Sequence, residues 1–168
     1  MFPLFTTQEY IHTVRENLHR NSEQLIQQIR KTINFNYYNK VDLLDYTAFI
    51  QPHEISIMMY SMDRKANEVF YQGNESNIFA GSYDIIEDVC FYNVPDDREE
   101  KFWEFYEQND EVISKTETPI IVDWFKDCWN QAGGKSVNLH SYFSFHDYDN
   151  CFDLQNNKWI SDGDKWFD

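Results

Sequence analysis

The sequence predicts an α+β fold in a single domain that covers residues 1–168. Three observations lead to this prediction. The first thirty or so residues have a helical period, the next forty have short apolar segments between turn residues, and two later proline-marked segments keep helical spacing. We expect a long N-terminal helix packed on an antiparallel sheet, two further aromatic-rich helices, and closing C-terminal strands. The length is usual for one domain, and neither a repeat nor a linker divides the chain.

The N-terminal helix is predicted from Thr6 to about Ile33. Its apolar residues recur at steps of three, four or seven, with charged residues between them. The apolar positions are Ile11, Val14, Leu18, Leu25, Ile29 and Ile33. Thr6 or Thr7 is a suitable N-cap, with Glu9 placed to complete a capping box at Thr6. We expect this helix to lie on the sheet of its own domain rather than against a coiled-coil partner.

Consecutive antiparallel strands are predicted next, at Leu43–Ile50 and Ile55–Met62, with a third at Glu68–Tyr71. The second of these is apolar on both faces, so we expect a central strand with protein on both sides. Residues Gly73–Gly81 read as a loop. Residues Ile85–Tyr92 fit either a strand or an irregular segment.

Two helices and three strands complete the prediction. Val94-Pro95-Asp96-Asp97 and Thr118-Pro119 are helix starts, because proline suits the first helical position, and Gly133-Gly134 ends the second helix. Phe102, Phe105 and Tyr106 are expected to face inward. A strand is predicted at Tyr142–His146, followed by a hairpin across Asn156-Asn157 that joins Phe152–Leu154 to Trp159-Ile160.

The composition of the chain excludes several classes of function. The chain has 29 Asp and Glu against 14 Lys and Arg, a formal charge of −15, so a bare phosphate backbone would be repelled and direct nucleic-acid binding is not expected. Hydrophobic residues make up 42%, which excludes intrinsic disorder.

No segment approaches the roughly 20 apolar residues of a membrane helix, and no basic residue precedes Arg15, so we expect neither a membrane span nor a secretory signal. The odd number of cysteines, Cys90, Cys128 and Cys151, favours reduced core thiols and a cytoplasmic location.

The strongest candidate for metal chemistry is a late cluster of His140, His146, Asp147 and Asp149. Imidazole and carboxylate are ligands that first-row transition metals accept. The spacing matches no zinc motif, and a strand that ends in an acidic turn explains the same residues. We therefore expect no metal and no cofactor, with a metal-assisted hydrolase as the alternative.

The sequence gives little support for nucleophilic catalysis. Cys128 lies on an apolar stripe between Trp124 and Trp129, where burial raises the pKa of a thiol instead of activating it. Gly133-Gly134-Lys135 is only a fragment of a phosphate-binding loop. We expect a protein that is not an enzyme.

The most unusual feature is an acidic segment from Asp84 to Glu111, which contains eleven acidic and two basic residues. An exposed helix that confers solubility is one explanation; a surface that steers a basic partner is the other. The candidate contacts are Asp96, Asp97, Glu99, Glu100, Glu104 and Glu107, with Trp103 as an aromatic anchor.

A small, strongly acidic α+β chain without a catalytic motif resembles the immunity proteins that bacteria make against polymorphic and contact-dependent growth inhibition toxins. The resemblance rests on whole-chain character: the −15 charge and the order of helix, strands, aromatic helix and closing strands. It implies an antitoxin that binds a cognate basic toxin, often a nuclease, stoichiometrically and blocks it. An acidic nucleic-acid mimic that occupies a DNA-binding protein is a further alternative.

Overall fold

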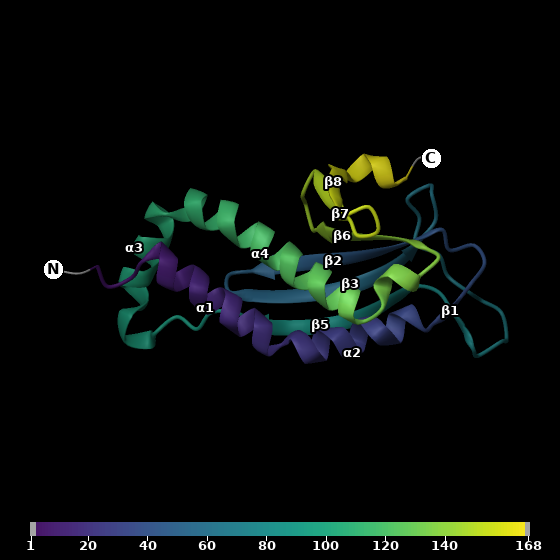
Figure 1. The fold of residues 1–168 in the computed structure, drawn as a ribbon, viewed down its shortest axis with the longest axis horizontal. Coiled ribbons are helices and arrows are strands. Elements are labelled where there is room, and N and C mark those ends of the chain that lie inside the picture. The colour runs from purple at the N-terminus through teal and green to yellow at the C-terminus, as the bar shows by residue number, and fades with distance from the viewer. Residues whose placement is uncertain (1–2, 167–168) are drawn as a thin grey trace.

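One face of a six-stranded sheet is covered by helices in the computed structural model, which describes residues 3–166 (Figure 1). The strand order is β5-β3-β2-β6-β7-β8, and β2 pairs with β6 in parallel whereas the other neighbours are antiparallel. The strands are β2 (Leu43–Gln51), β3 (Glu54–Met62), β5 (Ser82–Cys90), β6 (His140–Phe145), β7 (Asn150–Asp153) and β8 (Lys158–Ser161). The predicted α+β class is confirmed.

The N-terminal helix is divided in two, α1 (Thr7–Arg20) and α2 (Ser22–Ile33). The amide of Glu9 donates to the Thr6 hydroxyl at 3.1 Å, as the predicted cap requires. The break lies at Asn21, whose side chain donates to the carbonyl of Asn17 at 2.8 Å. Continuous helical spacing between Leu18 and Leu25 would turn Asn21 and Ser22 inward. A polar side chain that bonds to the nearby backbone, as Asn21 does, favours a break in the helix there.

The two predicted strands at the centre of the sheet are confirmed as β2 and β3. The third, at Glu68–Tyr71, is wrong: that segment makes a single bridge between Glu68 and Met62. The predicted loop contains a two-residue strand, β4 (Ile78–Phe79), parallel to β1 (Asn36–Tyr37). The ambiguous segment belongs to β5, an edge strand with irregular register against β3.

Cover on both faces of β3 was also expected, and that is wrong. Ile55, Ile57 and Met59 are buried under the helices, whereas the alternate side chains, such as Met58 and Tyr60, are only half-buried. The second face of the sheet is therefore partly open to solvent.

The helix start near Pro95 gives a 3₁₀ turn, η1 (Asp96–Arg98), followed by α3 (Glu99–Gln108). The second predicted start is wrong, since Pro119 lies inside α4 (Asp110–Gln131). Buried Ile113 extends the apolar stripe of α4 upstream of the proline, and its burial offsets the hydrogen bond that proline cannot donate. After α4 come Gly133, in the left-handed region with φ of 93°, and the 3₁₀ turn η2 (Gly134–Ser136).

The C-terminal strands follow the prediction. β7 and β8 form the expected hairpin, and Asn157 in its turn has a φ of 55°. Phe143 and Phe145 of β6 face the helices, where Phe143 stacks on Phe125 of α4 with ring centroids 4.2 Å apart. A last 3₁₀ turn, η3 (Asp162–Lys165), closes over the opposite face of the sheet.

Candidate functional site

The six predicted acidic contacts lie together on η1 and α3, and all are exposed. We call this set the acidic surface: Asp96, Asp97, Glu99, Glu100, Glu104 and Glu107. Glu100, Glu104 and Glu107 share one side of α3, since they are spaced by four and three residues. Buried Phe102 marks the other side. The helix lies at the end of the molecule remote from the C-terminus (Figure 1).

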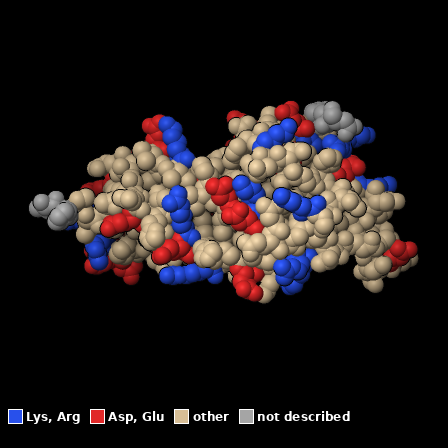
Figure 2. All heavy atoms as spheres, viewed as in Figure 1, with Lys and Arg blue, Asp and Glu red and all other residues tan. Residues whose placement is uncertain are grey.

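Cations near the acidic surface are few but present. Arg98 and Lys101 lie within the same segment, and the Arg98 guanidinium is 3.5 Å from a carboxylate oxygen of Asp97. Over the helical face of the molecule, Lys and Arg are interspersed with Asp and Glu (Figure 2). The remaining acids of the segment lie on the edge strand β5 and at the start of α4, where Glu111 pairs with Lys115 at 2.7 Å.

Trp103, the predicted aromatic anchor, is half-buried. Its ring packs against His53 and Tyr106, with centroid distances of 5.4 and 5.8 Å. Phe105 and Tyr106 are likewise half-buried, and Phe102 is fully buried, so the inward side of α3 is the one predicted. Only part of the Trp103 ring is available to a partner.

A buried polar triad of Tyr10, His53 and Glu117 lies beneath this end of the molecule. The Tyr10 hydroxyl is 3.3 Å from both His53 Nδ1 and Glu117 Oε2, and it donates to the carboxylate. Three elements meet here, α1, the β2–β3 turn and α4, and the turn holds His53 at a φ of 65°.

Burial sets the protonation of the triad. It raises the pKa of Glu117 to about 7, although the hydrogen bond from Tyr10 acts in the opposite direction. Burial also raises the pKa of Tyr10 and lowers that of His53. His53 Nε2 is buried without a hydrogen-bond partner among residues 3–166. Tyr10 and His53 are therefore neutral near neutral pH, whereas Glu117 is in the middle of its titration there.

A cleft of about 380 Å³ opens beside Glu117, at the ends of β2 and β6. Tyr106, His146 and Tyr148 are among its lining residues. An acid that titrates near neutral pH can exchange a proton in such a cleft. Sequence reasoning missed Glu117, although an acid between Ile113 and Ile121 at helical spacing was the available signal.

The late His/Asp cluster is not assembled. His140 begins β6 and His146 follows its last residue, so the two histidines lie at opposite ends of the strand. His146 is 3.4 Å from Asp147, in the turn beyond the strand as expected. Within the described residues, no group of three or more His, Cys, Asp or Glu side chains is placed to hold a metal ion.

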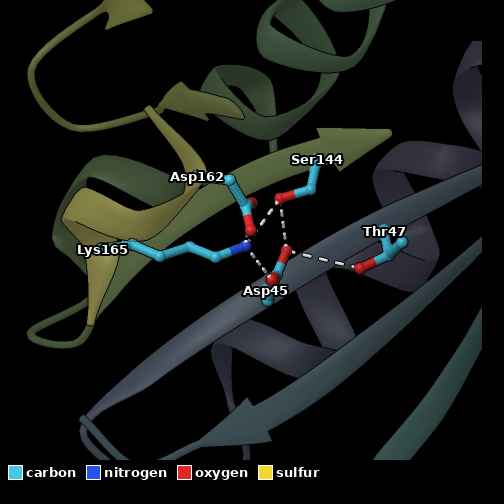
Figure 3. Close-up of polar contacts among 5 residues, drawn as sticks. All are labelled: Asp45, Thr47, Ser144, Asp162 and Lys165. Carbon is cyan, nitrogen blue, oxygen red and sulfur yellow. Dashed lines mark hydrogen bonds and ion pairs between the residues drawn. The ribbon is translucent and has the colours of Figure 1, made fainter. Parts of the chain in front are cut away.

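A second buried polar cluster lies on the opposite face of the sheet (Figure 3). Lys165 of η3 reaches Asp45 of β2 at 2.5 Å and Asp162 at 2.6 Å, and its ammonium is 3.1 Å from the Ser144 hydroxyl. Ser144 also donates to Asp45 at 2.8 Å. Sequence reasoning missed this cluster, whose only signal is an aspartate within the apolar strand β2.

A serine beside a lysine invites comparison with a catalytic pair, which requires a neutral amine. Burial acts to lower the pKa of Lys165, but Asp45 and Asp162 outweigh it and the net effect raises that pKa. Lys165 thus keeps its proton and cannot serve as the base for Ser144. The cluster fixes η3 to the sheet.

The cysteines differ in environment. Burial raises the pKa of Cys128 to about 11, as predicted for its apolar site, and that of Cys151 to about 12. Cys90, at the end of β5, is exposed, so the expectation that all three are core thiols is wrong.

Known protein families, curated proteins and solved structures give no match to this chain. None of the helices formed by residues 3–166 is both long and apolar enough to cross a membrane.

Proposed function

We propose that the protein is an immunity protein, which binds a cognate basic toxin through the acidic surface and neutralises it stoichiometrically. The observation that carries this proposal is the exposure of six carboxylates on one short helix and the turn before it. We place its action in the cytoplasm, where a nuclease toxin would find its substrate.

Electrostatic steering gives the acidic surface its role. A clustered negative field raises the association rate with a cationic partner and suppresses wrong partners. Carboxylates spaced along α3 imitate the phosphates that a nuclease recognises, and arginine side chains bind both groups through paired hydrogen bonds. The exposed part of Trp103 adds apolar contact, which slows dissociation.

The state of the buried candidate nucleophiles agrees with a binding role. Ser144 has no neutral amine beside it, and the buried thiols have raised pKa values, so neither is activated as a nucleophile. We therefore propose that the protein acts by occupying its partner, without catalysing a reaction.

The product of the gene directly upstream is the partner to test, because immunity genes commonly follow their toxin genes. We would measure its association rate with wild-type protein and with the variant Asp97→Lys/Glu100→Lys/Glu104→Lys at two salt concentrations. We expect the variant to associate at least ~10-fold more slowly at low salt, with a flatter salt dependence.

A matched control reverses three exposed acids elsewhere, Glu23→Lys/Glu75→Lys/Asp127→Lys, which changes the net charge equally. It should keep most of the wild-type rate. An unchanged rate in the folded α3 variant would show that the acidic surface is not the interface. Capture of a DNA-binding protein, with no binding to the upstream product, would instead favour a nucleic-acid mimic.

A further inference from the structure

The cleft beside Glu117 is lined by residues other than those of the acidic surface. It lies where the end of β2 and the turn between β6 and β7 meet α3 and α4, and its volume is about 380 Å³. That volume falls within the range of small-molecule sites, roughly 300–1,000 Å³. The buried lining residues, which form the base of the cleft, are Ala48, Glu117, Ile121 and Phe145. We call it the Glu117 cleft.

Apolar and aromatic side chains surround the opening of the Glu117 cleft. The turn after β6 lies beside the last residues of β2, and Phe49 packs against His146 with ring centroids 4.9 Å apart. Ile50 and Tyr148 also line the cleft and are 43% and 48% exposed. Such a lining favours contact with the apolar body of a ligand.

Tyr106 of α3 connects the base of the cleft with its opening. Burial raises the pKa of Tyr106, and the charges of Glu117 and Tyr148 are among those that raise it further, so its hydroxyl lies within electrostatic range of both. The Tyr106 ring is also 6.1 Å from the ring of Tyr10, the hydrogen-bond partner of Glu117. The aromatic lining and the buried acid therefore belong to one site.

One carboxyl oxygen of Glu117 has no donor within the fold. Oε2 accepts from the Tyr10 hydroxyl at 3.3 Å, whereas Oε1 accepts no hydrogen bond from residues 3–166. Glu117 is only 8% exposed, and it lines the cleft. A buried carboxylate that lacks donors and a counter-charge is costly, so a ligand that donates to Oε1 gains from the ionised form.

The charge that would complete this site is positive. Among residues 3–166, no Lys or Arg lines the cleft. Asp45 shows the completed arrangement elsewhere in the fold, because the Lys165 ammonium lies 2.5 Å from its carboxylate and 4.8 Å from the centre of the Trp166 ring. The Glu117 cleft offers a carboxyl and aromatic rings without the ammonium.

We propose that the Glu117 cleft binds a small organic cation, an aromatic ring that carries a primary ammonium group, with the ammonium at Glu117 and the ring against the aromatic side chains of the opening. A compact ammonium suits the single available oxygen, whereas a guanidinium is matched to two. The proposal does not depend on the toxin-binding role of the acidic surface, and either can fail without the other.

Binding of such a cation is coupled to the release of a proton. Burial raises the pKa of Glu117 to about 7 in the empty cleft, and the cation binds the ionised form. The apparent affinity follows the ionised fraction, so it should rise about tenfold from pH 6 to pH 8. The other titratable residues around the cleft are Tyr10, His53, Tyr106, His146, Asp147 and Tyr148. His146 needs a control, because an exposed histidine also changes charge in this interval.

The probe is 2-phenylethylamine, titrated into the isotope-labelled full chain at pH 6 and pH 8 and followed by amide chemical shifts. We expect saturable shifts centred on Ala48, Gln51, Thr118 and His146, with a Kd about tenfold lower at pH 8. The alcohol 2-phenylethanol has nearly the same shape without the charge. At pH 8 it should bind at least ~10-fold more weakly, because it forms no charge-assisted hydrogen bond.

The variant Glu117→Gln should bind the amine about tenfold more weakly at pH 8 and lose the pH dependence, since the group that ionises is gone. His146→Gln should keep the pH dependence, and Glu111→Gln, an exposed change on the same helix, should bind as wild type. Three results would each overturn the proposal: no saturable shifts at the cleft, equal affinity of wild type for the amine and the alcohol, or a pH dependence that persists in Glu117→Gln. The first two need no variant, so they stand whatever the substitution does to folding.

Discussion

Glu117 gives the sharpest prediction, because its environment couples stability to pH. The carboxyl is 8% exposed, and its pKa is raised from an ordinary value of 4.5 to about 7, mainly by burial. The folded state therefore holds a proton that the unfolded state has released between these two pH values. The free energy of unfolding contributed by Glu117 is full below pH 4.5 and is lost as pH rises through about 7.

The size of the effect follows from the two pKa values. At about 1.4 kcal/mol for each pKa unit, the rise from 4.5 to about 7 corresponds to about 3 kcal/mol. Most of this, roughly 2–3 kcal/mol, is lost between pH 5 and pH 8. Glu117→Gln keeps an oxygen that can accept from Tyr10 but cannot ionise, so the variant lacks this loss.

Urea unfolding of wild type and Glu117→Gln at pH 5, 6, 7 and 8 measures the difference directly. We expect similar stabilities at pH 5 and a variant that is more stable by roughly 2–3 kcal/mol at pH 8. Glu111→Gln, an exposed substitution on the same helix, serves as the control and should follow wild type. Parallel curves for wild type and Glu117→Gln would refute the assignment of a buried, desolvated acid.

Three further predictions concern the polar cluster at Lys165, the apolar core at Phe125 and the thiols. Lys165→Met leaves Asp45 buried without its cation and should cost about 3–5 kcal/mol in urea unfolding, part of which Asp45→Asn restores in the double variant. Phe125→Ala removes the ring that stacks on Phe143 and should lower the free energy of unfolding by about 3–5 kcal/mol in the same measurement. Cys90 should react with a thiol reagent in the native protein, whereas the two buried cysteines should react only in denaturant; three fast thiols would contradict the burial.

Local pattern was sufficient for the strands β2 and β3, for the C-terminal hairpin and for most of the helical surface. Two short apolar segments and a turn containing Pro52 identified β2 and β3, because both signals lie within a few residues. The ends of the helices were harder to predict from the sequence. The break at Asn21 and the continuation through Pro119 both depend on which neighbours bury the flanking apolar residues, and tertiary packing decides that.

The acidic surface could be predicted because exposure on a helix follows from spacing alone. The buried clusters could not, since their members are far apart in sequence. Asp45 and Lys165 are separated by 120 residues, and Tyr10 and Glu117 by 107. An aspartate in an apolar strand and a glutamate in an apolar stripe each indicate that a buried partner is present. Neither pattern identifies the distant residue that is the partner.

Asp45 and Glu117 show why identifying a buried acid is not enough to assign its role. The two residues have nearly the same exposure, 6% and 8%. Asp45 lies against an ammonium and a hydroxyl, so its charge is paired within the fold. Among residues 3–166, Glu117 has only a phenol as its donor, so burial favours the protonated form. A change from pH 5 to pH 8 therefore alters the charge beneath the α3 end while the ion pair that anchors η3 persists. Binding studies on the acidic surface should accordingly compare variants at one fixed pH.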